Sequence, residues 1–358
     1  MLCVLYVDMD AFYLSCERTR HPEIEGKPAI VAHDPKEGRG RGVVLSASYP
    51  ARALGFRSAM PVKQAWQQRD LVTWLLPDFE FYQALSDRVM AHLREVSPTT
   101  RVFSIDEAAL QAEVAGPEAA TQAAKEIQAE IRRRFDLPSS VGVAPTLTLA
   151  KMASDKAKPG GVHVVFPEHL REFLAGLPLR KVPGIGPVSE RALEASGART
   201  FDDVSRIPRP LLRKAVGSLG NTLREWSEGR IPEEPWPDDL PSKSMGQMVT
   251  FDEDQSEEPP IQDELQHLCD GLEESLGRSG MKFRSVTVQV RWEDLGTSQR
   301  SQTVRWPTES ASELRKLAKS LLRQLLESPE RGERKVRTLG VSVHGLRSAD
   351  PGQQRLPI

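Results

Sequence analysis

The stretch VFSIDEAAL, residues 102–110, places two adjacent carboxylates, Asp106 and Glu107, in a run that is otherwise typical of a buried β-strand. Burying an unpaired carboxylate is costly, so such a pair faces solvent, is protonated, or holds a cation. At the N-terminus a second apolar run also ends in acids, Asp8 and Asp10, within MLCVLYVDMDAFY. If the two strands are neighbours, their acids meet at one end of a sheet, and grouped carboxylate oxygens suit Mg²⁺ or Mn²⁺. The alternative is that both pairs mark strand ends that enter solvated turns.

Length and composition describe an ordinary water-soluble protein. The 358 residues suggest about two or three domains. Hydrophobic residues make up 39% and charged residues 27%, and no apolar run reaches the roughly 18 to 20 residues that a membrane helix needs. Residues 1–7 are too short and uncharged for a signal peptide, so we expect a cytoplasmic protein without a membrane partner. Because Cys3, Cys16 and Cys269 lie far apart in no metal-ligand spacing, we expect reduced, mostly buried thiols.

Charge is distributed unevenly, although the formal net charge is only -2. Residues 252–274 contain many acids and no Lys or Arg, whereas Lys and Arg outnumber acids from residue 275 to the end. A basic module beside an acidic one is typical of a nucleic-acid protein in which one surface holds phosphates. An ordinary solvated surface is the alternative interpretation.

The pattern of elements changes twice along the chain. Up to about residue 166, strands and helices alternate around a hairpin, which predicts a mixed α/β sheet of the split βαβ type with Asp8 beside Asp106. Residues 167–230 have a purely helical pattern interrupted by Pro and Gly. The segment IPEEPWPDDLP, residues 231–241, predicts a linker that is too polar to pack as an element. Beyond residue 242, strands alternate with two helices in a second small α+β domain.

The acids suggest a specific chemistry. Asp8, Asp106 and Glu107 are the minimum set for a two-metal site, in which one ion activates a hydroxyl and the other holds a triphosphate. Asp10 follows Asp8 by two residues and either joins the acids or caps the helix that begins at Ala11. A triphosphate also needs positive charge, which Arg52 in SYPAR and Lys158 in AKPGG can supply. Taken alone, each of these cations would be assigned to the solvated surface.

A second local signal lies in VPGIGPV, residues 182–188. A Gly-x-Gly turn between two short helices presents the backbone N–H groups of Gly184 and Gly186 to a phosphate without selecting a sequence. We favour a helix-hairpin-helix because prolines flank the turn and basic residues lie nearby. The alternative is a tight turn between helices.

These stretches together resemble the Y-family translesion DNA polymerases, most closely the DNA polymerase IV branch. The resemblance covers nearly the whole chain, in family order and spacing. It is carried by YVDMDAFYLSCE, GKPAIV, SASYPARALGFRSAMP, FSIDEA, VGVAPTLTLAKMASDKAKPGG, KVPGIGP and KSMGQMVTF.

The resemblance implies an α+β, multidomain right hand. It consists of a ferredoxin-like palm (1–10 and 78–166), small fingers (11–77), a helical helix-hairpin-helix thumb (167–233), a linker (234–242), an α/β little finger (243–346) and a flexible tail (347–358). Such an enzyme is a low-fidelity, template-directed DNA polymerase that uses two Mg²⁺ ions, for which Mn²⁺ can substitute. It works as a monomer on primer-template DNA and dNTPs, and is nucleoid-associated when on DNA.

The resemblance also implies residue roles. Asp8, Asp106, Glu107 and the Met9 carbonyl correspond to the metal ligands. Tyr13 corresponds to the steric gate that excludes a ribose 2′-hydroxyl. The triphosphate contacts correspond to Ser46, Tyr49, Arg52 and Lys158. Gly184 and Gly186 would hold the primer side of the duplex, and the basic strands after residue 275 would lie in the DNA groove.

The C-terminal QQRLPI resembles the peptide by which these polymerases dock on the sliding clamp, through Gln353, Leu356 and Ile358. Two apolar side chains of such a peptide fill a pocket, while the Gln sets the register. An unstructured tail without a partner is the alternative.

Three positions depart from the family pattern. Where relatives commonly have DEAYLD, this chain has DEAALQ, so Ala109 and Gln111 replace an aromatic residue and an acid. Leu45 stands where relatives often carry a smaller residue above the nascent base pair, and we hypothesise that it restricts the lesions that fit.

Two other functions stay open at this point. The chain could be a catalytically idle DNA-binding relative, although its acids are intact. It could also be a nucleotidyl cyclase, which would have no use for a phosphate-binding hairpin or a basic C-terminal module. Salt-sensitive binding to primer-template DNA would distinguish a polymerase from a cyclase.

Overall fold

The computed structural model describes residues 1–237, 243–329 and 331–348. It divides into two compact units, Met1–Asp238 and Asp239–Ile358. The predicted clamp peptide, with Gln353, Leu356 and Ile358, lies outside the described residues. Among the described residues, no helix has the length and apolarity needed to cross a membrane.

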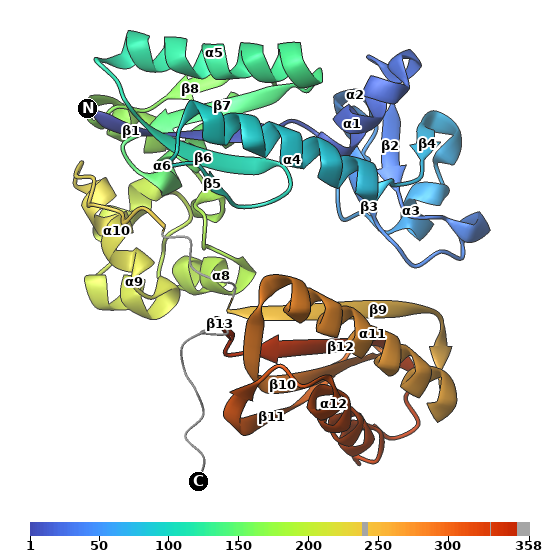
Figure 1. Cartoon of the computed structure of the whole chain (residues 1–358). Coiled ribbons are helices and arrows are strands. Elements are labelled where there is room, and N and C mark those ends of the chain that lie inside the picture. The colour runs from blue at the N-terminus through green and yellow to red at the C-terminus, as the bar shows by residue number, and fades with distance from the viewer. Residues whose placement is uncertain (238–242, 330, 349–358) are drawn as a thin grey trace. The chain divides into compact units, whose positions relative to one another are not determined.

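The N-terminal unit is built on a five-stranded central sheet in the order β5-β6-β1-β7-β8 (Figure 1). Its strands are β1 (Leu2–Met9), β5 (Arg101–Val102), β6 (Glu107–Glu113), β7 (Ser139–Ala144) and β8 (Val162–Val164). β1 runs antiparallel to both of its neighbours, and β8 is parallel to β7. The alternation of strands and helices predicted from the sequence is therefore present, with β1 beside β6.

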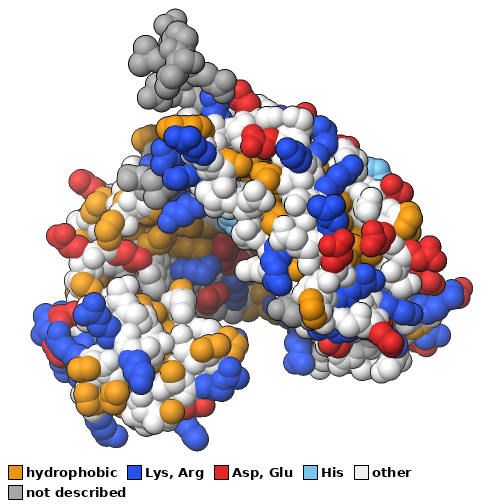
Figure 2. All heavy atoms as spheres, turned by 90° about the horizontal axis from the view of Figure 1, so that it is seen from below, with side chains coloured by type: hydrophobic (Ala, Val, Ile, Leu, Met, Phe, Trp, Pro, Cys, Tyr) orange, Lys and Arg blue, Asp and Glu red, His pale blue; other side chains and the backbone are white. Residues whose placement is uncertain are grey.

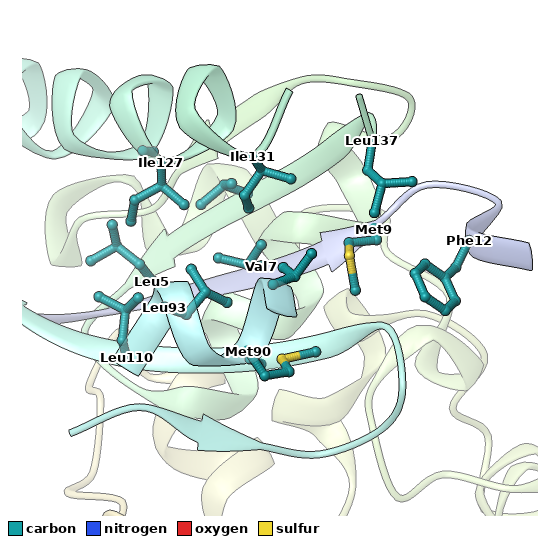
Figure 3. Close-up of a cluster of buried hydrophobic side chains, with 14 of the residues drawn as sticks. Leu5, Val7, Met9, Phe12, Met90, Leu93, Leu110, Ile127, Ile131 and Leu137 are labelled. Atoms are coloured by element: carbon teal, nitrogen blue, oxygen red, sulfur yellow. The ribbon is translucent and has the colours of Figure 1, made fainter. Parts of the chain in front are cut away.

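Helices cover both faces of this sheet. α4 (Phe79–Val96) and α5 (Pro117–Phe135) share a core with Leu5, Val7 and Met9 of β1 (Figure 3). α6 (Leu147–Ala157) packs with Val4 and Tyr6 on the opposite face. Burial on both faces explains why β1 is continuously apolar until Asp8, since a strand exposed on one face would alternate with polar residues.

A small sheet lies between β1 and α4 in the chain, in the order β3-β2-β4. Its strands are β2 (Ala29–Ala32), β3 (Val44–Ala47) and β4 (Thr73–Leu75), with helices α1 (Phe12–Arg20), α2 (Tyr49–Ala53) and α3 (Val62–Trp66). α2 begins where it does because the Ser48 hydroxyl accepts a hydrogen bond from the Ala51 N–H.

The predicted helical section contains α7 (Leu170–Leu174), α8 (Pro187–Ala195), α9 (Arg209–Val216) and α10 (Leu219–Ser227). Short 3₁₀ turns lie here at Pro167–His169, Leu179–Lys181 and Phe201–Arg206, and earlier in the chain at Pro22–Ile24, Lys36–Gly38 and Arg69–Leu71. The apolar side chains of this helical section join the core on the α6 face of the central sheet.

The Pro-rich segment after α10 forms no element in its described part, residues 231–237, as the sequence predicts, yet it contacts the core of the N-terminal unit. The Trp236 ring contacts the core, its Nε1 donates to the Thr99 carbonyl at 3.1 Å, and Arg101 Nε donates to the Pro237 carbonyl at 2.9 Å. One aromatic side chain and a few hydrogen bonds, including those from Thr148 to the Glu234 carboxylate, dock a segment that is polar on average.

The C-terminal unit has a four-stranded sheet in the order β11-β10-β12-β9. The strands are β9 (Ser244–Gln255), β10 (Met281–Trp292), β11 (Thr297–Thr308) and β12 (Val336–His344), and the short β13 (Arg347–Ser348) pairs with β10. α11 (Glu258–Ser279) and α12 (Ala311–Leu326) pack on the face that includes Val286, Val288 and Val290. On the face of the molecule shown in Figure 2, Lys and Arg side chains are interspersed with Asp and Glu.

Candidate active site

The register of β1 and β6 brings the predicted acids together. Asp8 pairs directly with Glu107, and the Met9 N–H donates to the Asp106 carbonyl at 2.9 Å. Residues 103–106 are not part of a buried strand, because β5 ends at Val102 and β6 begins at Glu107. Phe103 is exposed in the connecting turn. Asp106 therefore lies in the turn and Glu107 at the first position of β6, where acids are less costly than inside a buried strand.

A cavity of about 400 Å³ opens beside these acids. Residues from β1, α1, β3, α2, the turn before β6 and the turn after α6 line it. They include Asp8, Met9, Tyr13, Leu45, Ser46, Tyr49, Arg52, Asp106, Glu107 and Lys158. The structure thus gathers every residue predicted for metal, sugar and triphosphate contacts around one cavity.

Two lysines contact the acids. Lys158 Nζ lies 2.6 Å from Asp8 Oδ2 and 3.0 Å from Asp155 Oδ1. Lys151 Nζ lies 2.5 Å from Glu107 Oε1 and donates to the Tyr6 hydroxyl at 2.8 Å. Sequence reasoning missed Lys151, although it precedes Lys158 by seven residues, a spacing that returns to the same side of a helix.

Burial and these cations act in opposite directions on the acids. Burial raises the pKa of the Asp8 carboxyl to about 7, while the Lys158 ammonium opposes that rise. Burial also acts to raise the pKa of Glu107, but hydrogen bonds from Lys151 and Tyr6 outweigh it, so the net shift is downward. The pKa of Lys158 is raised, since Asp8 and Asp155 together outweigh the effect of burial on the ammonium.

The chemistry of the donor set fits a divalent cation. Three carboxylates and the backbone of Met9 lie at one sheet end, and oxygen ligands are those that hard cations prefer. Their present side-chain positions serve other partners: Ser104 Oγ donates to Asp106 Oδ1 at 2.5 Å, and the lysines contact Asp8 and Glu107. Within the described parts of the chain, no group of three or more His, Cys, Asp or Glu side chains converges on one point as a metal cage.

Aromatic and basic groups also line the cavity. Tyr13 on α1 is half-buried, and its ring packs against those of Phe79 and Tyr82. The Arg52 guanidinium lies 4.7 Å from the centre of the Tyr49 ring, and its Nε donates to the Ala47 carbonyl at 3.0 Å. Ser46 is buried on β3 beside half-buried Leu45. Packing against other rings therefore fixes Tyr13, whereas Tyr49 is exposed, and one hydrogen bond orients Arg52.

The predicted glycine hairpin has a 3₁₀ turn before it rather than an α-helix. Leu179–Lys181 precedes the hairpin and α8 follows it. Gly184 has a φ of +90°, which favours glycine, and Gly186 is the N-cap of α8. The predicted hairpin is thus present, and it ends at the N-terminus of α8.

Ala109 and Gln111 do not line the cavity. Ala109 is fully buried in the core on the α6 face, and Gln111 pairs with Val4 in the sheet. The departures from the family pattern at these positions therefore leave the cavity wall unchanged.

Family models cover most of the chain. The impB/mucB/samB family model matches residues 7–155, the model of that family's C-terminal domain matches 242–356, and an HHH motif model of the family matches 167–198. The DNA polymerase IV of Alkalilimnicola ehrlichii is 38% identical over 98% of this chain and 97% of its own length. The DNA polymerase IV of Methanoculleus marisnigri is 36% identical over 96% of this chain and 94% of its own length.

Solved structures agree with these relatives. A chimeric Y-family DNA polymerase superimposes with a TM-score of 0.86 at 29% identity, covering 97% of this chain and 99% of that one. An insertion ternary complex of Dbh DNA polymerase gives a TM-score of 0.66 at 29% identity, with the same coverage. The predicted α+β right-hand fold class is confirmed, as is the predicted activity of a template-directed DNA polymerase. This chain belongs to the Y-family of translesion DNA polymerases, in the DNA polymerase IV branch.

Proposed function

We propose that the cavity at the end of β1 is the nucleotidyl-transfer site of this polymerase, with Asp8, Asp106, Glu107 and the Met9 carbonyl holding two Mg²⁺ ions. The observation that carries the proposal is the pairing of Asp8 with Glu107 at the rim of a cavity that also contains Tyr13, Arg52 and Lys158. Enzymes of this family work with divalent metals. The oxygen-only donor set supports Mg²⁺, and Mn²⁺ can substitute because it accepts the same ligands.

The residues around the cavity have different roles in the proposed reaction. Bound metal ions would lower the pKa of the primer 3′-hydroxyl and neutralise the leaving pyrophosphate. Arg52 and Lys158 bind the triphosphate, together with the hydroxyls of Ser46 and Tyr49. Lys158 exchanges its contact with Asp8 for phosphate oxygens, which present more negative charge. Tyr13 closes the wall where a ribose 2′-hydroxyl would lie, so deoxynucleotides are selected by steric exclusion.

The remaining parts of the chain would hold DNA. We assign residues 1–10 and 78–166 to the palm, 11–77 to the fingers, 167–233 to the thumb and 243–346 to the little finger. The N–H groups of Gly184 and Gly186, at the start of α8, suit one phosphate of the primer strand. The C-terminal sheet has helices on one face and polar side chains such as Thr287 and Gln289 on the other, which leaves that face for a DNA groove.

The enzyme's partners follow from its substrate. We propose a monomer that binds primer-template DNA and dNTPs in the cytoplasm, where the chromosome lies, and that docks on a sliding clamp through Gln353, Leu356 and Ile358. Relatives named DNA polymerase IV along nearly the full chain argue against a nucleotidyl cyclase.

Primer extension with purified protein, Mg²⁺ and single dNTPs tests the proposed site. The parent should add the templated nucleotide, and Asp106→Ala should abolish addition while still binding primer-template DNA. Asp87→Ala removes an exposed carboxylate on α4 and serves as the matched control, which should extend as the parent does. A parent that binds DNA but adds no nucleotide, or an active Asp106→Ala variant, would contradict the proposal.

A further inference from the structure

Asp10 does not cap α1, and although it lines the cavity beside Asp8, its carboxylate is engaged by other parts of the chain. It is buried, with 2% of its surface exposed, and it lies between β1 and α1. Ala11 occupies the N-cap of α1, and no side chain caps that helix. Asp10 therefore needs another explanation for a carboxylate placed in the interior, since a buried charge without partners is strongly unfavourable.

The partners of Asp10 come from two distant segments. The Ser140 hydroxyl on β7 lies 2.9 Å from Asp10 Oδ1 and 3.0 Å from Oδ2. The Gly160 N–H donates to Asp10 Oδ2 at 2.8 Å, and it also lies 3.0 Å from Ser140 Oγ. Both carboxylate oxygens are thus engaged by protein donors. These hydrogen bonds stabilise the buried carboxylate and connect the end of β1 to β7 and to the turn after α6.

The turn that Asp10 holds is the one that carries Lys158. Lys158 is the C-cap of α6, and Gly160 follows it by two residues with a φ of +64°. Lys158 Nζ reaches into the cavity as far as Asp8 Oδ2. The backbone before Lys158 is therefore fixed by helix α6. The backbone after Lys158 is fixed by the hydrogen bond from the Gly160 N–H to Asp10. Because the lysine side chain itself is flexible, the position of this turn decides where its ammonium group can reach.

We propose that Asp10 is a positioning residue for the polymerase reaction: it holds the 158–160 turn so that Lys158 meets the triphosphate. This inference rests on the proposed role of Lys158 as a triphosphate ligand. It also separates two acids that are only two residues apart and that both line the cavity: the Asp8 carboxylate contacts Lys158, whereas the Asp10 carboxylate accepts from a hydroxyl and a backbone N–H. Asp10 then touches neither metal nor nucleotide and acts through Lys158.

Steady-state single-nucleotide insertion at saturating primer-template DNA tests the assignment. Asp10→Ala and Lys158→Ala should each raise the KM for dNTP by about tenfold, the scale of one lost charge-assisted hydrogen bond. The double variant should be no worse than the more impaired single variant, because residues that act through one another are not additive. The affinity for DNA should stay within about twofold of the parent in every variant.

Conservative variants distinguish positioning from metal binding. Asp10→Asn keeps an acceptor for the Gly160 N–H and offers an N–H to Ser140, so its dNTP KM should stay close to that of the parent. Ser140→Ala, which removes one donor and keeps the carboxylate, should raise the KM modestly and also fail to add to Lys158→Ala. It serves as the second probe if Asp10→Ala does not fold. Thr100→Val is the control for general destabilisation, since the Thr100 hydroxyl donates to the Leu93 and Ser97 carbonyls at the end of α4, away from the 158–160 turn. It should lower the melting temperature without changing the KM.

Each contrary result has its own meaning. If Asp10→Asn raises the dNTP KM as much as Asp10→Ala does and also raises the Mg²⁺ requirement, Asp10 is a metal ligand and the inference is overturned. Multiplicative effects of Asp10→Ala and Lys158→Ala would show independent roles and overturn it as well. An unchanged KM in Lys158→Ala alone would refute the triphosphate role of Lys158, and the positioning role with it. An unchanged KM in Asp10→Ala beside an impaired Lys158→Ala would refute the positioning role only.

Discussion

Lys151 Nζ lies 2.5 Å from Glu107 Oε1 and also hydrogen-bonds the Tyr6 hydroxyl, so a cation on α6 holds an acid of the hairpin against β1. The Tyr6 ring is stacked on that of Phe103 in the same hairpin. Glu107 is thus oriented from the face of the sheet that α6 covers. This network connects the core to the acids at the rim of the cavity.

Removing the Lys151 ammonium group should make the Mg²⁺ requirement of primer extension more sensitive to pH. Lys151 contributes to the downward shift of the Glu107 pKa, so Lys151→Ala should raise that pKa and favour the protonated acid. Protons then compete with metal, and the Mg²⁺ concentration for half-maximal extension should rise more at pH 6 than at pH 8. Tyr6→Phe keeps the ring and should have a smaller effect. The same Mg²⁺ dependence in Lys151→Ala and the parent at both pH values would refute this role.

Tyr13 should control sugar selection. Replacing it with Ala opens the cavity wall, so the preference for dCTP over CTP, measured as a ratio of kcat/KM values, should fall by at least about tenfold, or 1.4 kcal/mol. Tyr13→Phe retains the ring and its contacts with Phe79 and Tyr82, so it should keep the preference of the parent. If Tyr13→Ala discriminates as the parent does, another group excludes the 2′-hydroxyl.

Leu45 should limit which damaged templates fit. It is half-buried at the cavity wall beside Ser46, and truncation to Ala enlarges the space there. We expect Leu45→Ala to bypass bulky base adducts faster than the parent while extending undamaged templates similarly. The comparison is single-turnover insertion opposite each template. Equal bypass of bulky adducts by the two proteins would remove Leu45 as the determinant.

The two hairpin glycines should respond differently to Ala. Gly184 has a φ of +90°, so Gly184→Ala should lower both the melting temperature and the affinity for primer-template DNA. At Gly186 a new Cβ meets no atom within 4 Å, so Gly186→Ala should fold as the parent does. If a phosphate approaches this backbone, the added methyl group should still weaken DNA binding several-fold in a fluorescence anisotropy titration. Unchanged affinity in Gly186→Ala would place the phosphate elsewhere.

Buried thiols should resist alkylation in the native protein. Burial raises the pKa of Cys16 to about 12 and that of Cys269 to about 11. Below those values the neutral thiol dominates, and only the thiolate is a good nucleophile. Iodoacetamide at pH 8 should therefore modify both only after urea is added, as followed by mass spectrometry. Because they lie in different units, rapid native labelling of one would show that its unit opens.

Much of the fold could be predicted because its signals are local. The apolar run of β1 and the prolines that begin α5 and α8 each specify an element within a few residues. Two apolar runs with acids at one end predicted Asp8 beside Asp106, and the structure brings both acids to one sheet end, with Asp8 paired to Glu107 and the Met9 N–H bonded to the Asp106 carbonyl. Trp236 could not be placed, because its contact with Thr99 joins positions 137 residues apart in a segment whose average composition is polar.

The amino-acid sequence by itself determined the element order, the family and the residue types that meet at the cavity, since hydrophobic periodicity and motif spacing are properties of neighbouring residues. Only the tertiary structure decided the partners of the charged groups. Lys151 contacts Glu107 and Gly160 contacts Asp10 because α6 packs on one face of the sheet and the turn after it lies beside the end of β1. A buried charge must find its partner in three dimensions, and no spacing along the chain encodes which segment will provide it.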